Sequence, residues 1–292
     1  MGFSKRILRC WLPILGFLAV ATSACSGRSD APSVLPINAP VPAAQKTLFG
    51  ALIHTESCNF NACVTAVNDL NLDIVAIGFV PTVDPWSLYD KWLAAIPQQK
   101  VLALIALPTV ANPPSPEQLA QYAAAVAQRY PEIKYFEILN EPNEQQYYPG
   151  GMNPSLYLRY FSLAAAAITS VNPGATVMGP AIHGFDSSYI QVMPQNAVIA
   201  VHPYGYQPDN VASPFATLRA EGYPNYWVSE WGYVDPVAMW EACAANGCGA
   251  AIYYQLQDSP DSPGTGLLDA QGRPTATYQE AKQFLQQRQA LP

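Results

Sequence analysis

The chain has 292 residues and a formal net charge of −7, and 50% of its residues are hydrophobic. This length suits one large domain with a sizeable core, and it is close to the roughly 250 residues of an eight-stranded α/β barrel. The acidic balance argues against nucleic acid or an acidic polymer as the main partner.

The first 24 residues have the pattern of an export signal peptide. Lys5, Arg6 and Arg9 precede an apolar run over residues 11–20 that is too short to span a bilayer and ends in small residues. The segment carries three basic and no acidic side chains, so its removal would lower the net charge from −7 to −10.

Residues 21–26, Ala-Thr-Ser-Ala-Cys-Ser, resemble the lipobox of bacterial lipoproteins, although Thr22 stands where leucine is usual. The resemblance implies that Cys25 is lipidated, and acyl groups would anchor the protein without any spanning helix. The alternative is ordinary cleavage after Ala24 with Cys25 unmodified. We therefore expect an exported protein of the bacterial envelope, periplasmic or at the cell surface, held to the membrane by an N-terminal lipid.

A tether and one folded domain follow the signal. Residues 25–46 are rich in proline, serine and alanine without a period, which is typical of an extended linker. We expect residues 47–292 to form a single domain and the protein to be a monomer.

Within this domain, short apolar runs of strand length alternate with amphipathic segments of helix length. The runs are continuous in valine, isoleucine, leucine, alanine and tyrosine, as expected for parallel strands buried on both faces. We predict strands over residues 48–54, 72–79, 101–107, 133–141, 175–181, 197–204, 226–230 and 250–256. We predict helices over residues 61–70, 85–96, 115–130, 153–172, 234–246 and 277–287.

Two of the helices carry clear start signals. Ser115-Pro116-Glu117-Gln118 has the pattern of a capping box, and Asn153-Pro154 opens the next helix. Eight strands and about eight helices favour a single-domain (β/α)₈ TIM barrel, with an open doubly wound sheet as the second architecture.

Of six cysteines, Cys10 would leave with the signal peptide and Cys25 would carry the lipid, and the remaining four form two closely spaced pairs. In an oxidising compartment, two local disulfides are the simplest interpretation, although four cysteines allow three connectivities. A zinc site is the alternative, but no histidine accompanies either pair. The candidates are Cys58, Cys63, Cys243 and Cys248.

Two strands end in a glutamate beside aromatic or amide residues. Glu141 lies in residues 136–143, Phe-Glu-Ile-Leu-Asn-Glu-Pro-Asn, and Glu230 lies in residues 227–232, Trp-Val-Ser-Glu-Trp-Gly. Cleavage of a glycosidic bond needs one carboxylic acid to protonate the leaving oxygen and one carboxylate to attack or to activate water. The alternative is that each glutamate pairs with a lysine or arginine on the barrel rim.

The first motif resembles the acid/base strand of the retaining glycoside hydrolase clan built on (β/α)₈ barrels, known as clan A. It is closest in look to family 39 and to the family 5 cellulase-like enzymes. In that clan an asparagine-glutamate pair ends strand four and the nucleophile ends strand seven. Residues 202–206, His-Pro-Tyr-Gly-Tyr, and residues 266–274 before the last helix match as well. The resemblance covers most of residues 48–285.

The resemblance implies a role for each matching residue. Glu141 corresponds to the general acid/base and Glu230 to the nucleophile. Asn140 corresponds to the amide that binds the sugar 2-hydroxyl, and Tyr204 to the tyrosine that keeps the nucleophile ionised. Two positions depart from the clan: residues 77–79, Ile-Gly-Phe, lack its strand-two arginine, and residues 253–257 lack its strand-eight tryptophan.

Other side chains at the strand ends are candidates for binding sugar. Histidines end strands one, five and six, and aromatic rings crowd the same end of the barrel, where apolar sugar faces can stack. A zinc site built from His54, His183 and His202 is the alternative use of the histidines. Glu137, four residues before Glu141, is expected to be a buried structural carboxylate. The predicted substrate-binding residues, besides Asn140 and Tyr204, are His202, Trp231, His54, Tyr206 and Tyr254.

The sequence thus predicts a retaining glycoside hydrolase that cuts a β-linked polysaccharide or oligosaccharide by double displacement. This chemistry needs no cofactor and no metal. The alternative is a non-catalytic carbohydrate-binding lipoprotein on a degenerate glycosidase barrel. A metal-dependent hydrolase that uses the histidines is a third, less favoured interpretation.

Overall fold

The computed structural model describes residues 46–80, 85–97, 100–107, 114–148, 151–260 and 262–289. The predicted signal peptide, Cys25 and the predicted tether up to residue 45 lie outside the described residues, and they stay predictions.

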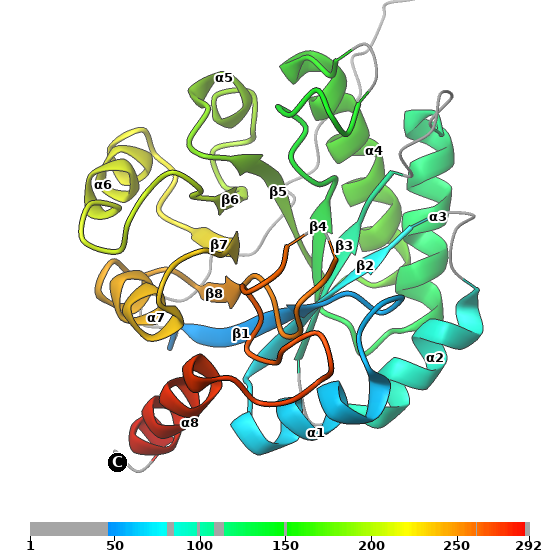
Figure 1. Ribbon diagram of the computed structural model, residues 1–292. Helices are drawn as coiled ribbons and strands as arrows, with labels where there is room; N and C mark the ends of the chain where they lie inside the picture. The colour runs from blue at the N-terminus through cyan, green and yellow to red at the C-terminus, as the bar shows by residue number, and fades with distance from the viewer. Residues whose placement is uncertain are drawn as a thin grey trace, which may run out of the picture. The chain divides into compact units, whose positions relative to one another are not determined.

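Eight parallel strands form a closed barrel in chain order, so that β1 pairs with both β2 and β8 (Figure 1). This confirms the (β/α)₈ barrel and excludes the open doubly wound sheet. The strands are β1 Leu48–Ile53, β2 Ile74–Phe79, β3 Lys100–Ile105, β4 Tyr135–Ile138, β5 Thr176–His183, β6 Val198–His202, β7 Tyr226–Trp231 and β8 Ala250–Tyr253.

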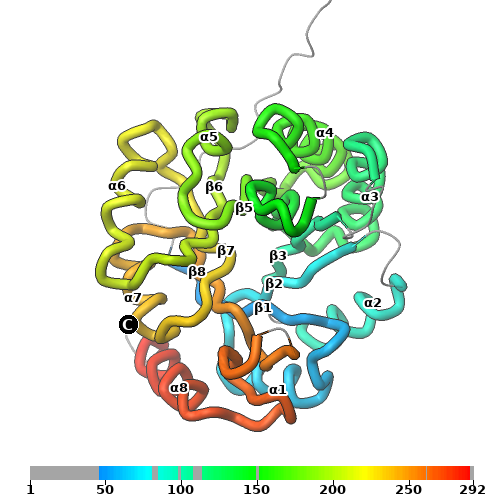
Figure 2. Tube along the Cα trace, turned by 45° about the horizontal axis from the view of Figure 1, so that its top comes forward, coloured from blue at the N-terminus to red at the C-terminus, as the bar shows by residue number. Residues whose placement is uncertain are grey.

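A helix follows each strand, and the helices surround the barrel (Figure 2). Within the described residues, no helix has the length and apolar character that a membrane crossing requires. The helices are α1 Phe60–Leu70, α2 Trp86–Ala95, α3 Pro116–Arg129, α4 Pro154–Val171, α5 Ser187–Ile190, α6 Ala212–Ala220, α7 Pro236–Ala245 and α8 Ala276–Gln289.

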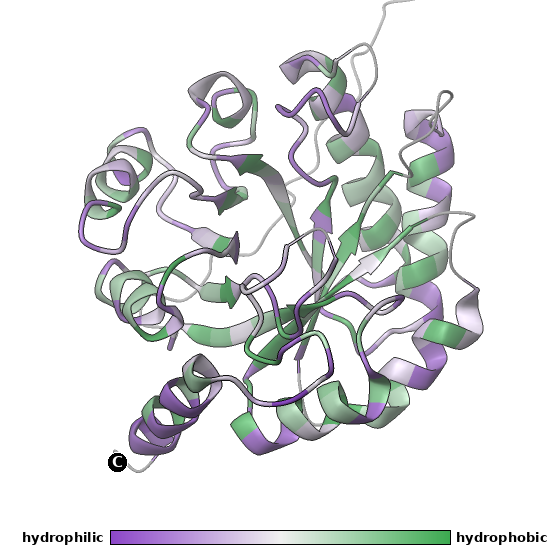
Figure 3. Cartoon of the chain, viewed as in Figure 1, coloured by the Kyte–Doolittle hydropathy of each residue, from purple (hydrophilic) through white to green (hydrophobic). Residues whose placement is uncertain are grey.

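The core has two layers. One fills the barrel with residues that include Leu52, Met178 and Trp227. The larger layer lies between strands and helices and includes Phe136 and Trp240. Figure 3 shows the corresponding pattern, with mostly hydrophobic strands and helices that also carry hydrophilic residues. Buried strands with two apolar faces therefore explain the continuous apolar runs in the sequence.

The predicted helix starts are confirmed. Ser115 accepts a hydrogen bond from the backbone of Gln118, whose side chain accepts one from the backbone of Ser115. Asn153 accepts a hydrogen bond from the backbone N–H of Leu156 at 2.8 Å. Helices α5 and α6 were not among the predicted ranges; the first has only four residues, too few to show helical periodicity.

The cysteine prediction is confirmed for one pair and wrong for the other. A disulfide joins Cys58 and Cys63. Cys243 and Cys248 are free, buried thiols. The backbone N–H of Cys248 donates to the carbonyl of Cys243 at the end of α7, so the two residues meet in the core. Burial, with the Cys243 thiol beside it, raises the pKa of the Cys248 thiol, which disfavours the thiolate that oxidation needs.

Candidate active site

Glu141 follows the short strand β4 and is positioned by an irregular turn. Leu139 and Glu141 have φ of 66° and 42°, a conformation that non-glycine residues rarely adopt. The predicted strand to residue 141 therefore ends early, at Ile138. The backbone N–H of Glu141 donates to the carbonyl of Ala181 at 2.9 Å, which ties the turn to β5. Backbone strain of this kind is typical of functional sites.

Glu230 lies near the end of β7, where the strand's alternation is broken. Trp227 faces the barrel interior, and regular alternation would point Trp231 the same way. The register with β8 is irregular between Val228 and Trp231. Beyond this irregularity, Trp231 packs in the outer core layer and Glu230 reaches the interior side chains of the barrel mouth.

His202, at the end of β6, lies among three carboxylates. Its Nδ1 is 2.9 Å from Oε1 of Glu141 and 4.0 Å from Oε1 of Glu230. Its Nε2 is 3.9 Å from Oε1 of Glu137. His202 and Glu137 are almost fully buried, and Glu141 and Glu230 are 4% and 9% exposed. We call these four residues the mouth cluster.

Burial and neighbouring groups shift the pKa values of two members of the mouth cluster, His202 and Glu230. Burial by itself lowers the pKa of His202, but the surrounding carboxylates, Glu230 first, raise that pKa well above its ordinary value. Burial raises the pKa of Glu230, while His202 and the Tyr204 hydroxyl act to lower it. The proton affinities of His202 and Glu230 are therefore set by opposing contributions, with burial on one side and charged or hydrogen-bonding partners on the other.

Tyr204 distinguishes Glu230 from Glu141. Its hydroxyl donates a hydrogen bond to Oε1 of Glu230 at 2.8 Å, which is the contact that the sequence resemblance implies. Glu141 instead has the imidazole of His202 at one oxygen. The two carboxyl groups therefore sit in different environments, as acid and nucleophile must.

Glu141 and Glu230 do not form the alternative ion pairs with lysine or arginine on the barrel rim within the described residues. In the described part of the chain, the ion pairs of Glu141 and Glu230 involve histidines alone, namely His183 and His202. The alternative of lysine or arginine partners is therefore wrong for the described residues.

Three more predicted residues, Tyr254, His54 and Asn140, lie at the barrel mouth beside the cluster. Tyr254 packs its ring edge to face with His54 at 5.5 Å between centroids, and its hydroxyl is 3.4 Å from Oγ of Ser262. The charge of Glu230 contributes to raising the pKa of Tyr254, after burial. Nε2 of His54 is buried without a hydrogen-bond partner among the described residues. Asn140 is half-buried, and its carbonyl accepts a hydrogen bond from Tyr148.

Two predicted sugar contacts are not where the sequence suggested. Trp231 is 0% exposed, because the irregular register of β7 turns it to the helices, and it offers no face to a ligand. Tyr206 lies beyond the mouth cluster, against Phe185 in a separate cavity beside α6.

Two side chains outside the predicted set join the site. His183 has its Nδ1 4.0 Å from Glu141 and 3.7 Å from Glu144. Tyr233 is 64% exposed, packs 6.1 Å from the ring of Tyr204 and donates a hydrogen bond to Ser262. The sequence offered a signal for both, since each falls at or just after a strand end.

One group of residues could ligate a metal ion. One ligand atom each from Glu141, His202 and Glu230 lies within 4.8 Å of the others. The same atoms are already paired with each other and with Tyr204. The alternative zinc site of three histidines is not formed by the described residues, because His54 and His183 do not join this group.

Comparison with known proteins finds similarity in fold. No family model and no curated protein sequence matches the chain. Among solved structures, it resembles a GH39 enzyme from Xanthomonas axonopodis pv. citri, with a TM-score of 0.61 and 15% identity over 84% of this chain and 67% of that one. It also resembles a monomeric beta-xylosidase from Caulobacter crescentus CB15, with a TM-score of 0.64 and 16% identity over 83% and 68%. A GH30 endoxylanase from Clostridium papyrosolvens C71 gives 0.58 and 18% over 83% and 72%. The chain thus has a glycosidase-like barrel.

Proposed function

We propose that this protein is a retaining glycoside hydrolase that acts on a β-linked carbohydrate, with Glu141 as acid/base and Glu230 as nucleophile. The observation that carries the proposal is the pair itself: two buried glutamates at the ends of strands four and seven, close together and with different hydrogen-bond partners. Catalytic residues of such barrels lie at this end of the strands.

The separation of the carboxyl groups supports retention. An oxygen of Glu141 and an oxygen of Glu230 approach within 4.8 Å. Retaining glycosidases hold their carboxyl groups about 5 to 5.5 Å apart, whereas inverting enzymes hold them roughly 6.5 to 9.5 Å apart to admit a water. The close approach favours direct attack by Glu230.

The hydrogen-bond partners suggest how the work divides. Glu230 attacks the anomeric carbon as Glu141 transfers its proton to the leaving oxygen, so a glycosyl ester forms and the glycosidic bond breaks. Glu141 then takes a proton from water, which attacks the same carbon and releases Glu230. Tyr204 stabilises Glu230 as an anion before the attack and after release.

The substrate class rests on the neighbours and on the aromatic mouth. Two of the similar structures are a beta-xylosidase and a GH30 endoxylanase. Tyr233 and Tyr254 offer rings beside Glu230, where the clan places a tryptophan. The family 5 part of the resemblance stays a prediction. The lipid anchor at Cys25 and the envelope location remain part of the proposal and rest on residues 1–26 alone.

The test is hydrolysis of β-1,4-linked xylan, mannan and cellulose oligosaccharides, with the anomer of the first product followed by proton NMR. Retention is expected; an inverted first product would contradict the roles given to the pair. Glu230→Gln should abolish hydrolysis while oligosaccharide binding by calorimetry persists. Binding without hydrolysis in the unaltered protein would instead establish the carbohydrate-binding lipoprotein.

A further inference from the structure

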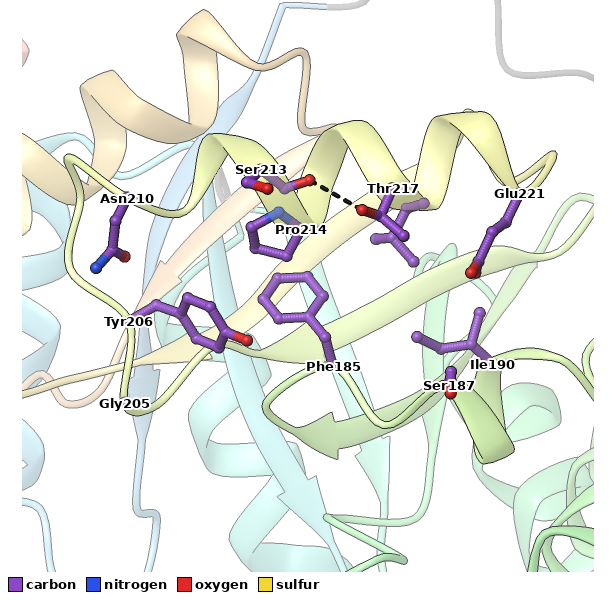
Figure 4. A pocket seen from close by; sticks show the side chains of 11 residues that line it. Phe185, Ser187, Ile190, Gly205, Tyr206, Asn210, Ser213, Pro214, Thr217 and Glu221 are labelled. Carbon is purple, nitrogen blue, oxygen red and sulfur yellow. Dashed lines mark hydrogen bonds between the residues drawn. The ribbon is translucent and has the colours of Figure 1, made fainter.

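A cavity of about 530 Å³ lies outside the mouth cluster between α6 and the segment that carries α5 (Figure 4). Aromatic rings line one part of it and hydroxyl-bearing side chains another. Of the predicted site residues, Tyr206 alone belongs to it.

Two glycine turns build the aromatic part. Gly184 follows β5 and Gly205 follows β6, with φ of 72° and 85°. A Cβ at either glycine would meet no atom within 4 Å, so the backbone conformation, not space, is what favours glycine there. The next residue after each turn, Phe185 or Tyr206, packs edge to face with the other at 5.1 Å between ring centroids. In Figure 4 these two rings meet in the middle of the cavity.

Helix α6 provides the polar wall. Ser213, Thr217 and Glu221 are spaced four residues apart, so they share one face of the helix, and all three are exposed. Thr217 uses its hydroxyl hydrogen to bond the carbonyl of Ser213, which leaves its oxygen able to accept. Across from them, the hydroxyl of Tyr206 has no hydrogen-bond partner within the described residues.

The cavity lies next to the mouth cluster, because residues of the two sites are near neighbours in the chain. His183 lies two positions before Phe185, and Tyr204 lies two positions before Tyr206. The ring centroids of His183 and Tyr204 are 5.5 Å apart. His183 reaches Glu141, and Tyr204 bonds Glu230. Two residues of extended chain span at most about 7 Å. A ligand held in the catalytic site is therefore close enough to extend into the cavity.

The chemistry of the lining selects a neutral, hydroxyl-rich ligand. None of the described residues that line the cavity is basic, so an anion gains no counter-charge there, and Glu221 adds a negative charge. Aromatic rings next to hydroxyl and carboxylate acceptors suit a sugar, which presents an apolar face and donor hydroxyls together.

We infer that this cavity is a distal glycan subsite, which binds further sugar units of the chain whose bond lies between Glu141 and Glu230. This inference rests on the proposed function for the identity of the ligand. It means that the protein acts on oligosaccharides and polysaccharides better than on short glycosides.

The test fills the cavity from its polar wall. Thr217→Trp places an indole in the cavity, and Ala216→Trp, at an exposed neighbour on the same helix that does not line it, is the matched control. The probes are xylohexaose, mannohexaose and cellohexaose, each compared with the 4-nitrophenyl β-glycoside of the same sugar. We expect Thr217→Trp to lower the ratio of kcat/KM for the hexasaccharide to that for the aryl glycoside at least about tenfold, from lost stacking and hydrogen bonds. Ala216→Trp should leave the ratio unchanged.

A ratio that is unchanged in Thr217→Trp overturns the inference, whether both kcat/KM values stay the same or fall equally. If no probe is hydrolysed, the proposed function fails, and calorimetric binding of the three hexasaccharides decides about the cavity. Binding that is lost in Thr217→Trp but kept in Ala216→Trp then supports a glycan site without hydrolysis. Absent binding, or equal binding by all three proteins, overturns it.

Discussion

The barrel mouth and the helical layer around α3 and α4 differ in how well their structure agrees with local sequence preferences. In α3, the local sequence alone dictates the outcome, with a capping box, a first-turn proline and an apolar face of Leu119, Ala123 and Val126 buried on the barrel. At the mouth, Leu139 and Glu141 adopt a left-handed backbone, and several polar atoms are buried without a described partner.

This difference separates stability from function. Cap residues and the buried apolar face agree along α3, whereas the mouth cluster concentrates burial of charge and backbone strain, both of which cost stability. Such costs persist where a working geometry requires them. The comparison therefore predicts that substitutions at the mouth change activity far more than stability, and that substitutions in the helical layer do the reverse.

After Glu230→Gln, which should abolish hydrolysis, Glu141→Gln should have the largest effect on activity. Without the acid, kcat/KM on an oligosaccharide is expected to fall by about 10² to 10⁴, while a nitrophenyl glycoside, whose leaving group needs little protonation, loses much less. Glu144→Gln is the matched control, because Glu144 also lies near His183 but is far more exposed than Glu141. Steady-state kinetics on both substrates checks this. Equal losses on the two substrates would argue against an acid role for Glu141.

Tyr204→Phe should shift the pH profile. The Tyr204 hydroxyl lowers the pKa of Glu230, which burial raises, so its removal lets that pKa rise further. Because Glu230 must be ionised to attack, the acidic limb of kcat/KM against pH should move to higher pH, with activity near neutral pH reduced roughly 10- to 100-fold. A Glu230 pKa above its unfolded value means that ionising it costs stability, and Tyr204→Phe enlarges this cost as pH rises. If the acidic limb of kcat/KM does not move in Tyr204→Phe, the Tyr204 hydroxyl does not control the ionisation of Glu230.

Ser115→Ala tests the other side of the comparison. The substitution removes the oxygen that accepts from the backbone of Gln118 and should lower the free energy of unfolding by about 1 kcal/mol. Catalysis should not change, because α3 takes no part in the mouth. Ser170→Ala, an exposed serine inside α4, serves as control and should not destabilise the protein. Denaturant unfolding measures the free energy of unfolding of both variants. A reduced kcat/KM in Ser115→Ala would contradict the prediction that substitutions in the helical layer change stability and not activity.

The sequence predicted the barrel and most element boundaries because apolar runs and cap residues are local signals. It also predicted the strand ends that carry Glu141 and Glu230. It missed the burial of Trp231, since a broken register between β7 and β8 depends on the partner strand and not on the local pattern. It ended β4 too late for a similar reason: the backbone N–H of Leu139 donates to the Ile105 carbonyl of β3, and that of Glu141 donates to the Ala181 carbonyl of β5.

Two other predictions failed because of packing: the disulfide between Cys243 and Cys248 does not form, and Tyr206 does not lie at the barrel mouth. Equal spacing in the two cysteine pairs suggested equal chemistry, but Cys248 lies in the buried turn after α7, where the thiol stays protonated. Tyr206 follows a glycine turn that carries it out of the mouth toward α6. Neither the burial of a turn nor the direction in which it carries the chain can be inferred from the residue types alone.

Metal removal should have the smallest effect of all. Glu141, His202 and Glu230 offer ligand atoms within 4.8 Å of one another, so the mouth could in principle hold a cation. The two-carboxylate mechanism, however, uses the carboxylate oxygens of Glu141 and Glu230 for proton transfer and attack, and it needs no ion there. Incubation with EDTA should therefore leave kcat/KM unchanged, and added Zn²⁺ should inhibit by competing for these atoms. Loss of activity on chelation, restored by Zn²⁺, would replace the carboxylate mechanism with a metal-dependent one.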